Sequence, residues 1–230
     1  MTALVTGSSG HLGEALVRTL RNRGSPVIGL DVAPSPFTDQ VGSIDDEDVV
    51  QACVRDIDVV YHTATLHKPH VATHSEQQFV ATNVTGTLNL LQAAVAARVR
   101  AFVFTSTTST FGAAMNPAPG QPAVWVTESL PPIPKNIYGV TKVAAEHLCE
   151  LFHRRDGLAC LVLKTSRFFP EPDDDAAVRA RFPWANAQAN EFLNRRVEIE
   201  DLVAAHLLAA ERAQDLSFGR YVISRKTPTC

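Results

Sequence analysis

The chain begins with a glycine-rich turn between an apolar run and a helical pattern. Residues Thr2–Thr6 are typical of a buried strand, and helical periodicity begins at His11. The connecting sequence, TGSSGHLG, places glycines at Gly7, Gly10 and Gly13. Gly7 permits a tight turn, and Gly13 permits close packing of the helix on the strand. We therefore expect a strand–turn–helix unit at the start of the chain.

The start of this helix is suited to a phosphate group. Gly10 lets the backbone approach a pyrophosphate, and the first helical turn offers unpaired N–H groups. Asp31 ends the next apolar run, 18 residues after Gly13, where a carboxylate can accept hydrogen bonds from both ribose hydroxyls. It would repel a 2′-phosphate, and no arginine follows at Val32 or Ala33. The pattern predicts NAD in preference to NADP; the alternative is an ordinary glycine turn and an aspartate that starts a loop.

Apolar runs alternate with helical stretches along the rest of the chain. Further strands are predicted at Pro26–Asp31, Asp58–His62, Arg100–Thr105, Leu158–Lys164 and Arg220–Ser224. Helices are predicted at His11–Arg23, Asp45–Val54, Ser75–Ala97, Ile137–Arg154 and Ile199–Arg212. Strands that are apolar throughout and separated by helices are typical of a parallel sheet covered on both faces. The predicted fold class is α/β, with a doubly wound parallel sheet.

Two stretches interrupt this alternation. Met115–Pro134 holds six of the 14 prolines and predicts a stiff loop. Thr165–Asn190 has no clear period. We divide the chain into a dinucleotide-binding core, residues 1–164, and a partial substrate lobe, residues 165–230, interleaved with the last helix and strand of the core.

The composition argues against several kinds of partner. With 20% charged residues and a formal net charge of −3, the chain has no electrostatic reason to bind nucleic acid or an anionic membrane. No apolar run approaches the roughly 20 residues that a membrane span needs. The four cysteines are scattered and form no CxxC pair, as expected of free thiols in a reducing compartment. We expect a cytoplasmic protein.

Tyr138 and Lys142 lie four residues apart, so they share one face of a predicted helix. A phenol with the usual pKa of about 10 is a poor acid or base at neutral pH, and a neighbouring ammonium lowers that pKa. Ser106–Thr110 adds a hydroxyl cluster at the carboxyl end of a strand, where such sheets bind ligands. Taken singly, these features also fit a surface pair and a solvated turn.

Together, these segments resemble the extended short-chain dehydrogenase/reductase family, in its NAD-dependent epimerase/dehydratase group. TGSSGHLG is similar to the family's TGxxGxxG, and YGVTK to its YxxxK. Val59–Thr65 resembles the segment that passes over the dinucleotide, Thr82–Leu91 the long helix with an asparagine, and Phe104–Gly112 the hydroxyl-rich strand end. The resemblance runs from Thr2 to about Ser224 and implies a Rossmann-like fold with a small, truncated C-terminal substrate lobe.

The resemblance also implies roles for individual residues. Tyr138 would exchange the substrate hydroxyl proton, Lys142 would lower its pKa and bind the nicotinamide ribose, and Thr107 would hydrogen-bond the reacting oxygen. The cofactor-binding residues would be Gly7, Ser9, Gly10, His11, Leu12, Gly13, Asp31, Ser43, Ile44, Thr63, Ala64, Thr65, Asn83, Thr105, Tyr138 and Lys142. The substrate-binding residues would be His67, Thr108 and Arg167. The resemblance also implies a homodimer that packs through the two long helices, Ser75–Ala97 and Ile137–Arg154.

The sequence departs from the family pattern at several positions. Thr108 and Ser109 replace the Asp-Glu pair of the 4,6-dehydratases, which disfavours dehydration. Arg167 takes the place of an asparagine that helps hold a sugar-nucleotide diphosphate, and Ser43 replaces an aspartate near the adenine. Family members usually continue beyond the last strand predicted here, so the chain is either a natural short form with an open site or a fragment.

We therefore expect an NAD-dependent oxidoreductase or epimerase that acts on a secondary alcohol of a sugar or sugar nucleotide. The alternative is a non-catalytic NAD-binding sensor or scaffold of the same fold. No metal is predicted: Pro69 interrupts the histidine series His67, His70 and His74, and the acidic residues Glu171 and Asp173–Asp175 lack the glycine and ligand spacing of a calcium loop.

Overall fold

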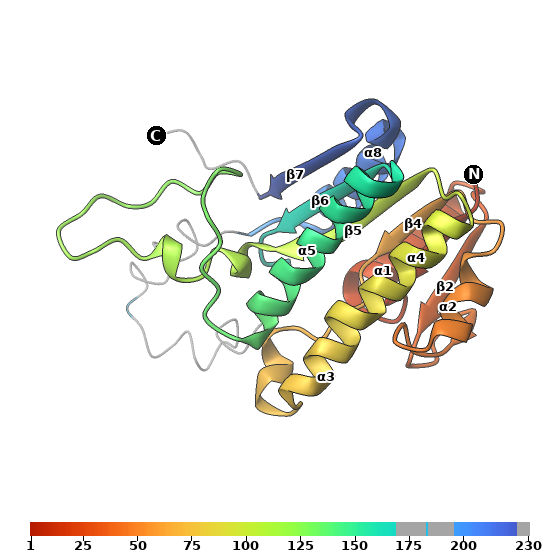
Figure 1. The fold of residues 1–230 in the computed structure, drawn as a ribbon, viewed down its shortest axis with the longest axis horizontal. Coiled ribbons are helices and arrows are strands. Elements are labelled where there is room, and N and C mark those ends of the chain that lie inside the picture. Colours follow the sequence, from red (N-terminus) through yellow and green to blue (C-terminus); the bar gives the residue numbers. More distant parts are fainter. Residues whose placement is uncertain (169–182, 184–195, 225–230) are drawn as a thin grey trace.

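The computed structural model describes residues 1–168, 183 and 196–224, and these form one parallel sheet between two layers of helices (Figure 1). The strands are β1 (Ala3–Thr6), β2 (Val27–Asp31), β3 (Gln40–Val41), β4 (Val59–His62), β5 (Ala101–Thr107), β6 (Cys160–Thr165) and β7 (Phe218–Ile223). All pairings are parallel, in the order β3-β2-β1-β4-β5-β6-β7. The predicted doubly wound α/β fold is confirmed.

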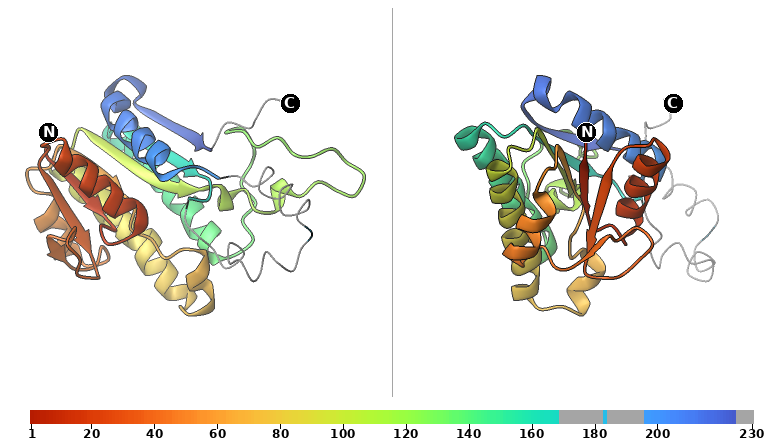
Figure 2. Two further views of the ribbon diagram at one scale, coloured as in Figure 1. Left: turned by 180° about the vertical axis from the view of Figure 1, so that it is seen from behind. Right: turned by 90° about the vertical axis from the view of Figure 1, so that its right-hand side faces the viewer.

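Helices cover both faces of the sheet (Figure 2). The main helices are α1 (His11–Asn22), α2 (Glu47–Val54), α3 (Glu76–Val80), α4 (Gly86–Ala96), α5 (Ile137–Asp156) and α8 (Ile199–Leu216). One core joins the sheet to α1 and α8, through residues such as Leu16 and Leu202. The other joins it to α2, α4 and α5, through residues such as Leu90 and Phe152. The central strands are mostly apolar because both of their faces are buried, and their polar residues gather toward the carboxyl ends.

Local sequence signals set the helix boundaries. The Asp46 side chain caps α2 by accepting from the N–H groups of Asp48 and Val49, and Asn136 caps α5 by accepting from Gly139. The long helix α5 ends at Gly157, which adopts the left-handed conformation. The Asn136 cap therefore sets the residue at which α5 begins, and with it the position of the first turn of this helix beside the sheet.

Some predicted boundaries differ from the structure. The helix predicted at residues 75–97 consists of α3, a π-helical segment (Ala81–Thr85) and α4. Strand β3 has two residues, too few to give a periodic signal, and was not predicted. Strand β5 extends two residues beyond the predicted end, so Ser106 and Thr107 belong to the strand. Most of residues 169–195 lie outside the described part, so the division into core and lobe stays a prediction.

The proline-rich segment predicted as a loop contains no regular helix or strand from residue 116 to residue 134. Figure 1 shows it projecting beyond the carboxyl ends of the strands. Its base is closed by hydrogen bonds: the Ala113 N–H donates to the Ile133 carbonyl at 2.7 Å, and the Ile133 N–H to the Phe111 carbonyl at 3.3 Å. The segment therefore leaves the sheet and returns at nearly the same point.

Candidate active site

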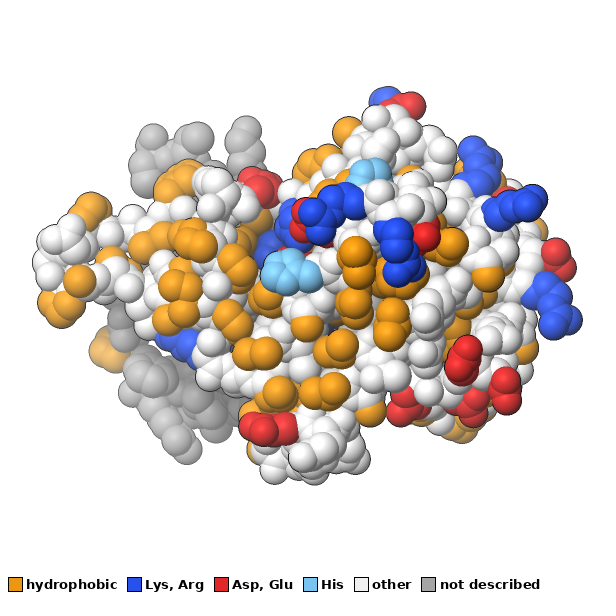
Figure 3. Space-filling model, viewed as in Figure 1, with side chains coloured by type: hydrophobic (Ala, Val, Ile, Leu, Met, Phe, Trp, Pro, Cys, Tyr) orange, Lys and Arg blue, Asp and Glu red, His pale blue; other side chains and the backbone are white. Residues whose placement is uncertain are grey.

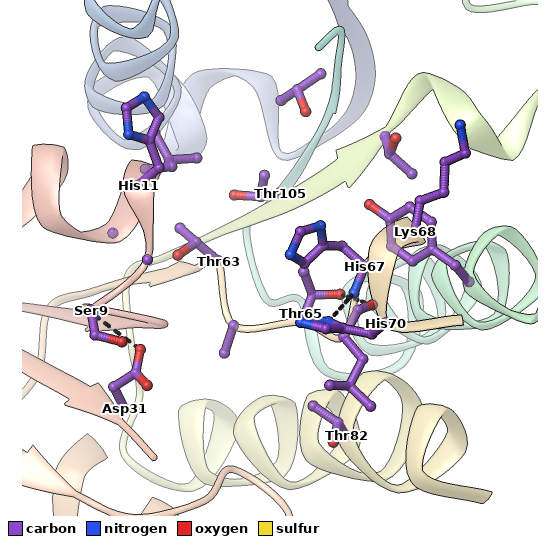
Figure 4. A pocket seen from close by; sticks show the side chains of 18 of the residues that line it. Ser9, His11, Asp31, Thr63, Thr65, His67, Lys68, His70, Thr82 and Thr105 are labelled. Carbon is purple, nitrogen blue, oxygen red and sulfur yellow. Dashed lines mark hydrogen bonds between the residues drawn. The ribbon is translucent and has the colours of Figure 1, made fainter. Parts of the chain in front are cut away.

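A cavity of about 790 Å³ lies at the carboxyl ends of β2, β4, β5 and β6 (Figure 4). It spans the point between β1 and β4 at which the strand order reverses, the usual ligand position in an open α/β sheet. The predicted cofactor-binding residues that line it are Ser9, Gly10, His11, Leu12, Gly13, Asp31, Ser43, Ile44, Thr63, Ala64, Thr65, Thr105 and Tyr138. The predicted substrate-binding residues His67, Thr108 and Arg167 line it as well. Gly7, Asn83 and Lys142 do not.

The glycine-rich turn has the predicted close packing. Gly7 has φ +73°, and a Cβ at Gly13 would lie 1.9 Å from the Gly7 carbonyl oxygen, so the helix can approach the strand only without side chains. Gly10 is the N-cap of α1 and provides no capping side chain. The first N–H groups of α1 therefore remain available to an anion, and the cradle fits a dinucleotide pyrophosphate.

The Asp31 carboxylate is held in place by backbone donors at the end of β2. Its Oδ2 accepts from the Ser9 N–H and its Oδ1 from the Ala33 N–H, both at 2.9 Å (Figure 4). A carboxylate offers about four acceptor positions, so each oxygen keeps one for a hydroxyl group. This arrangement suits a ribose diol and disfavours a 2′-phosphate.

Thr107 and Tyr138 meet at the opposite end of the cavity, where both line it. Burial raises the pKa of Tyr138 to about 12, and an interaction with the Thr107 hydroxyl partly lowers it again. The phenol is therefore protonated at neutral pH. The expected lowering of this pKa by Lys142 is not found in the structure, because desolvation of the buried phenol dominates.

Lys142 lies beside this site, buried behind the cavity wall. Its side chain is 2% exposed, and its Nζ lies 4.0 Å from the centre of the Phe104 ring. Burial lowers the pKa of Lys142 to about 7, although the Glu146 carboxylate acts in the opposite direction. Lys142 does not line the cavity, so its expected contact with a nicotinamide ribose stays a prediction.

Asn83 has a different environment from the one expected of a cofactor contact. Its Oδ1 accepts from the Leu66 N–H and the Thr65 hydroxyl, while its Nδ2 donates to the Leu66 carbonyl and the Thr141 hydroxyl. All its hydrogen-bonding capacity is used within the protein. Asn83 thus ties the segment after β4 to α5 and supports the cavity wall.

Two buried histidines near the site had no recognisable signal in the sequence. His62 accepts or donates at both ring nitrogens, with Thr6 at 2.8 Å and Thr87 at 2.9 Å, and its pKa is lowered by burial and by Lys142. His206 of α8 bonds the Thr105 hydroxyl at 2.8 Å, and burial lowers its pKa to about 4. Both rings are neutral supports for residues beneath or beside the cavity floor.

The wall opposite the glycine-rich turn carries a histidine cluster from the segment after β4. The His67 and His70 ring centres are 4.4 Å apart, and those of His70 and His74 are 5.0 Å apart. Burial and the neighbouring His70 lower the pKa of His67, and burial and the neighbouring His74 lower the pKa of His70. His70 Nδ1 accepts from the His67 N–H (Figure 4). The acidic residues 171 and 173–175 lie outside the described part of the chain.

Further lining residues were missed by sequence reasoning. Thr165 ends β6, Ser166 and Phe168 follow it, and the centres of the stacked Phe168 and His11 rings are 6.2 Å apart. Lys68, His70 and His74 complete the wall after β4. The rule that ligands bind beyond the carboxyl ends of parallel strands would have found the β6 residues, whereas no pattern marks the others.

This fold and cavity define a dinucleotide-binding protein of the short-chain dehydrogenase/reductase type. The model of the NAD dependent epimerase/dehydratase family matches residues 3–224, and the chain belongs to this family. The predicted family and the predicted cofactor, NAD, are thereby confirmed.

Two proteins that are similar to this chain differ in the activity that their names state. A 3 beta-hydroxysteroid dehydrogenase/Delta 5-->4-isomerase of Mycobacterium tuberculosis is 35% identical over 180 residues, 74% of this chain and 48% of the relative. A UDP-glucose 4-epimerase of Lactobacillus helveticus is 30% identical over 91% of this chain and 72% of its own length. The chain thus spans about half the length of the steroid dehydrogenase.

A solved structure with a similar fold also contains the cofactor. A short-chain dehydrogenase/reductase superfamily protein from Agrobacterium tumefaciens, with bound NAD, is 26% identical and has a TM-score of 0.81 over 100% of this chain and 79% of its own.

Within the described residues, the helices are either too short or too polar to cross a membrane.

Proposed function

We propose that this protein transfers a hydride between NAD and a secondary alcohol or ketone carbon of a sugar or sugar nucleotide. One observation carries the proposal: the anion-binding turn, the Asp31 carboxylate and the Thr107–Tyr138 pair line a single cavity, at opposite ends. The glycine-rich turn and Asp31 would hold the dinucleotide at the first end, and Thr107 and Tyr138 would hold the reacting oxygen of the substrate at the second. When bound, NAD supplies the hydride acceptor or donor.

The residues of the chain handle the proton. With a pKa raised to about 12, Tyr138 holds its proton at neutral pH and can donate it to an oxygen that gains negative charge during reduction. In the oxidative direction, Tyr138 must lose its own proton before it can accept the hydroxyl proton of the substrate, and its raised pKa makes that loss less favourable at neutral pH. Thr107 hydrogen-bonds the reacting oxygen and orients it beside the phenol.

The polarity of the substrate end supports a sugar nucleotide over a steroid. Lys68 and Arg167 line this end together with His67, Thr108 and Ser109. Cations and hydroxyls suit a phosphorylated, hydroxyl-rich substrate, whereas a steroid requires mainly apolar walls.

Thr108 and Ser109 lack the acid–base chemistry needed to eliminate water, so we propose oxidation or epimerisation and not dehydration.

The decisive experiment compares Tyr138→Phe with the parent on UDP-glucose, UDP-galactose and a 3β-hydroxysteroid. We expect the parent to transform a sugar nucleotide and the variant to be slower by about 100-fold or more, with unchanged NAD binding. Tyr221→Phe, a change in β7 outside the cavity, is the matched control. Equal rates for Tyr138→Phe and the parent would contradict the catalytic role and favour the sensor or scaffold alternative.

The same assay separates the two reactions within the proposal. An epimerase returns the hydride, so NAD stays bound and unreduced overall. A dehydrogenase releases NADH, which absorbs near-ultraviolet light and accumulates. Turnover of the steroid without turnover of either sugar nucleotide would contradict the proposed substrate class.

A further inference from the structure

A buried ion pair lies behind the cavity, outside its lining. Glu146 of α5 and Lys164 of β6 are 2% and 3% exposed, and the Lys164 Nζ lies 2.8 Å from the Glu146 Oε2. Desolvating two charges costs several kcal/mol per ion, roughly what their attraction returns. A pair of apolar side chains would serve stability as well. The pair therefore needs an explanation other than stability.

Each partner of the pair holds a hydroxyl on one side of Thr107. The Ser106 hydroxyl donates to the Glu146 Oε1 at 2.5 Å, and the Lys164 Nζ donates to the Thr110 Oγ1 at 3.1 Å. Thr110 in turn donates from its hydroxyl to the Thr107 carbonyl at 2.8 Å. The ion pair therefore holds Ser106, which precedes Thr107, and Thr110, which bonds the Thr107 carbonyl.

The same carboxylate belongs to the helix that carries Tyr138. Tyr138, Lys142 and Glu146 follow one another at intervals of four residues, so they lie on one buried face of α5. Glu146 therefore connects the helix of the phenol to the strand of the hydroxyl. One turn further, Glu150 pairs with Arg220 of β7 at 2.7 Å, and Arg220 also lies 3.5 Å from the Glu146 Oε2.

We propose that Glu146 and Lys164 are positioning residues, which hold Ser106 and Thr110 so that the Thr107 hydroxyl keeps its place beside the Tyr138 phenol. The inference rests on the proposed function for its meaning, since Thr107 and Tyr138 are the proposed reacting pair. The geometric claim can be tested without a substrate, so the two proposals can fail separately.

The test uses tyrosine labelled with ¹³C at Cζ, whose chemical shift responds to hydrogen bonding of the phenol. The chain has three tyrosines, and Tyr138→Phe identifies the signal of Tyr138. Thr107→Val removes the hydroxyl that interacts with the phenol and defines the shift of an unpaired Tyr138. All spectra are recorded on NAD-saturated protein near pH 7.

The main variant is Glu146→Leu/Lys164→Met, because replacing both charges of a buried pair with apolar groups preserves folding. We expect its Tyr138 signal to move toward the position in Thr107→Val, while the signal in Asp156→Asn, a matched control in the Arg155–Asp156 pair at the end of the same helix, stays in place. Glu146→Gln, which leaves the Lys164 charge unpaired, should shift the signal in the same direction. An unmoved Tyr138 signal in the folded double variant would overturn the proposal, whatever the outcome of the turnover assay.

Discussion

Lys142 is a buried amine that forms no ion pair with the described residues. Its stabilising contacts include the Phe104 ring and the field of Glu146, and burial still lowers its pKa to about 7. Burial of such a group reduces stability, and proteins often keep residues of this kind for activity. The cost of burying it depends on pH in a calculable way.

We expect Lys142→Met to be more stable than the parent at pH 7, with an advantage that shrinks as the pH rises. Between pH 7 and the ordinary pKa of 10.5, the unfolded chain holds a proton on Lys142 that the folded protein lacks, so parent stability increases with pH. The advantage should therefore fall by about 1.4 kcal/mol per pH unit in this window. Urea unfolding of both proteins from pH 6 to 10 measures it; a constant difference would contradict the lowered pKa.

At this scale, sequence reasoning located contacts that depend on motif spacing. Asp31 and the glycine turn lie at the predicted cavity because strand–turn–helix geometry fixes them within a few residues. The interpretation of Asn83 and Lys142 was less complete, since burial and partners such as Leu66 and Phe104 depend on the tertiary structure. The raised pKa of Tyr138 has the same origin.

Among the elements, the π-helical segment Ala81–Thr85 has the clearest structural consequence. One wider turn between α3 and α4 lies where Asn83 reaches the backbone of the segment after β4. Such turns occur often at functional sites. The hydrophobic period alone predicted a single uninterrupted helix here, because a one-residue change of pitch leaves the apolar face almost unchanged.

We expect Asn83→Ala to loosen the cavity wall between residues 63 and 74. The change leaves the partly buried Leu66 N–H and carbonyl without their Asn83 partner, which costs about 1–3 kcal/mol of unfolding free energy. Hydrogen exchange at Leu66 should accelerate, and the affinity for NAD should fall. Asn89→Ala, which removes two hydrogen bonds from the same helix to Ile44 and Asp45, is the control and should leave Leu66 protected.

At the scale of the whole molecule, an apolar surface covers the outer side of α4 and α5 (Figure 3). Val140 and Leu151 of α5 are 49% and 40% exposed, and Val80 at the end of α3 is 44% exposed. These are the helices through which a homodimer was expected. No sequence pattern points directly to the dimer, because exposure of a helix face can be judged only once the sheet is in place.

We expect the protein to sediment as a dimer at micromolar concentration and Leu151→Glu to shift it toward monomer. A carboxylate in the centre of an apolar interface loses its hydration without gaining a partner, which costs a few kcal/mol per subunit. Arg154→Gln, one turn away at an exposed position, lowers the net charge by the same one unit and so separates this effect from a change of net charge. A parent protein that sediments as a monomer would contradict the prediction.

The closed base of the proline-rich segment also affects how this molecule can change over evolution. Because Ala113 and Ile133 meet through backbone hydrogen bonds, the chain between them can lengthen, shorten or acquire new side chains without displacing Thr107 or Tyr138. Natural variants and engineered libraries can therefore diversify residues 116–132 while the reacting groups stay in register.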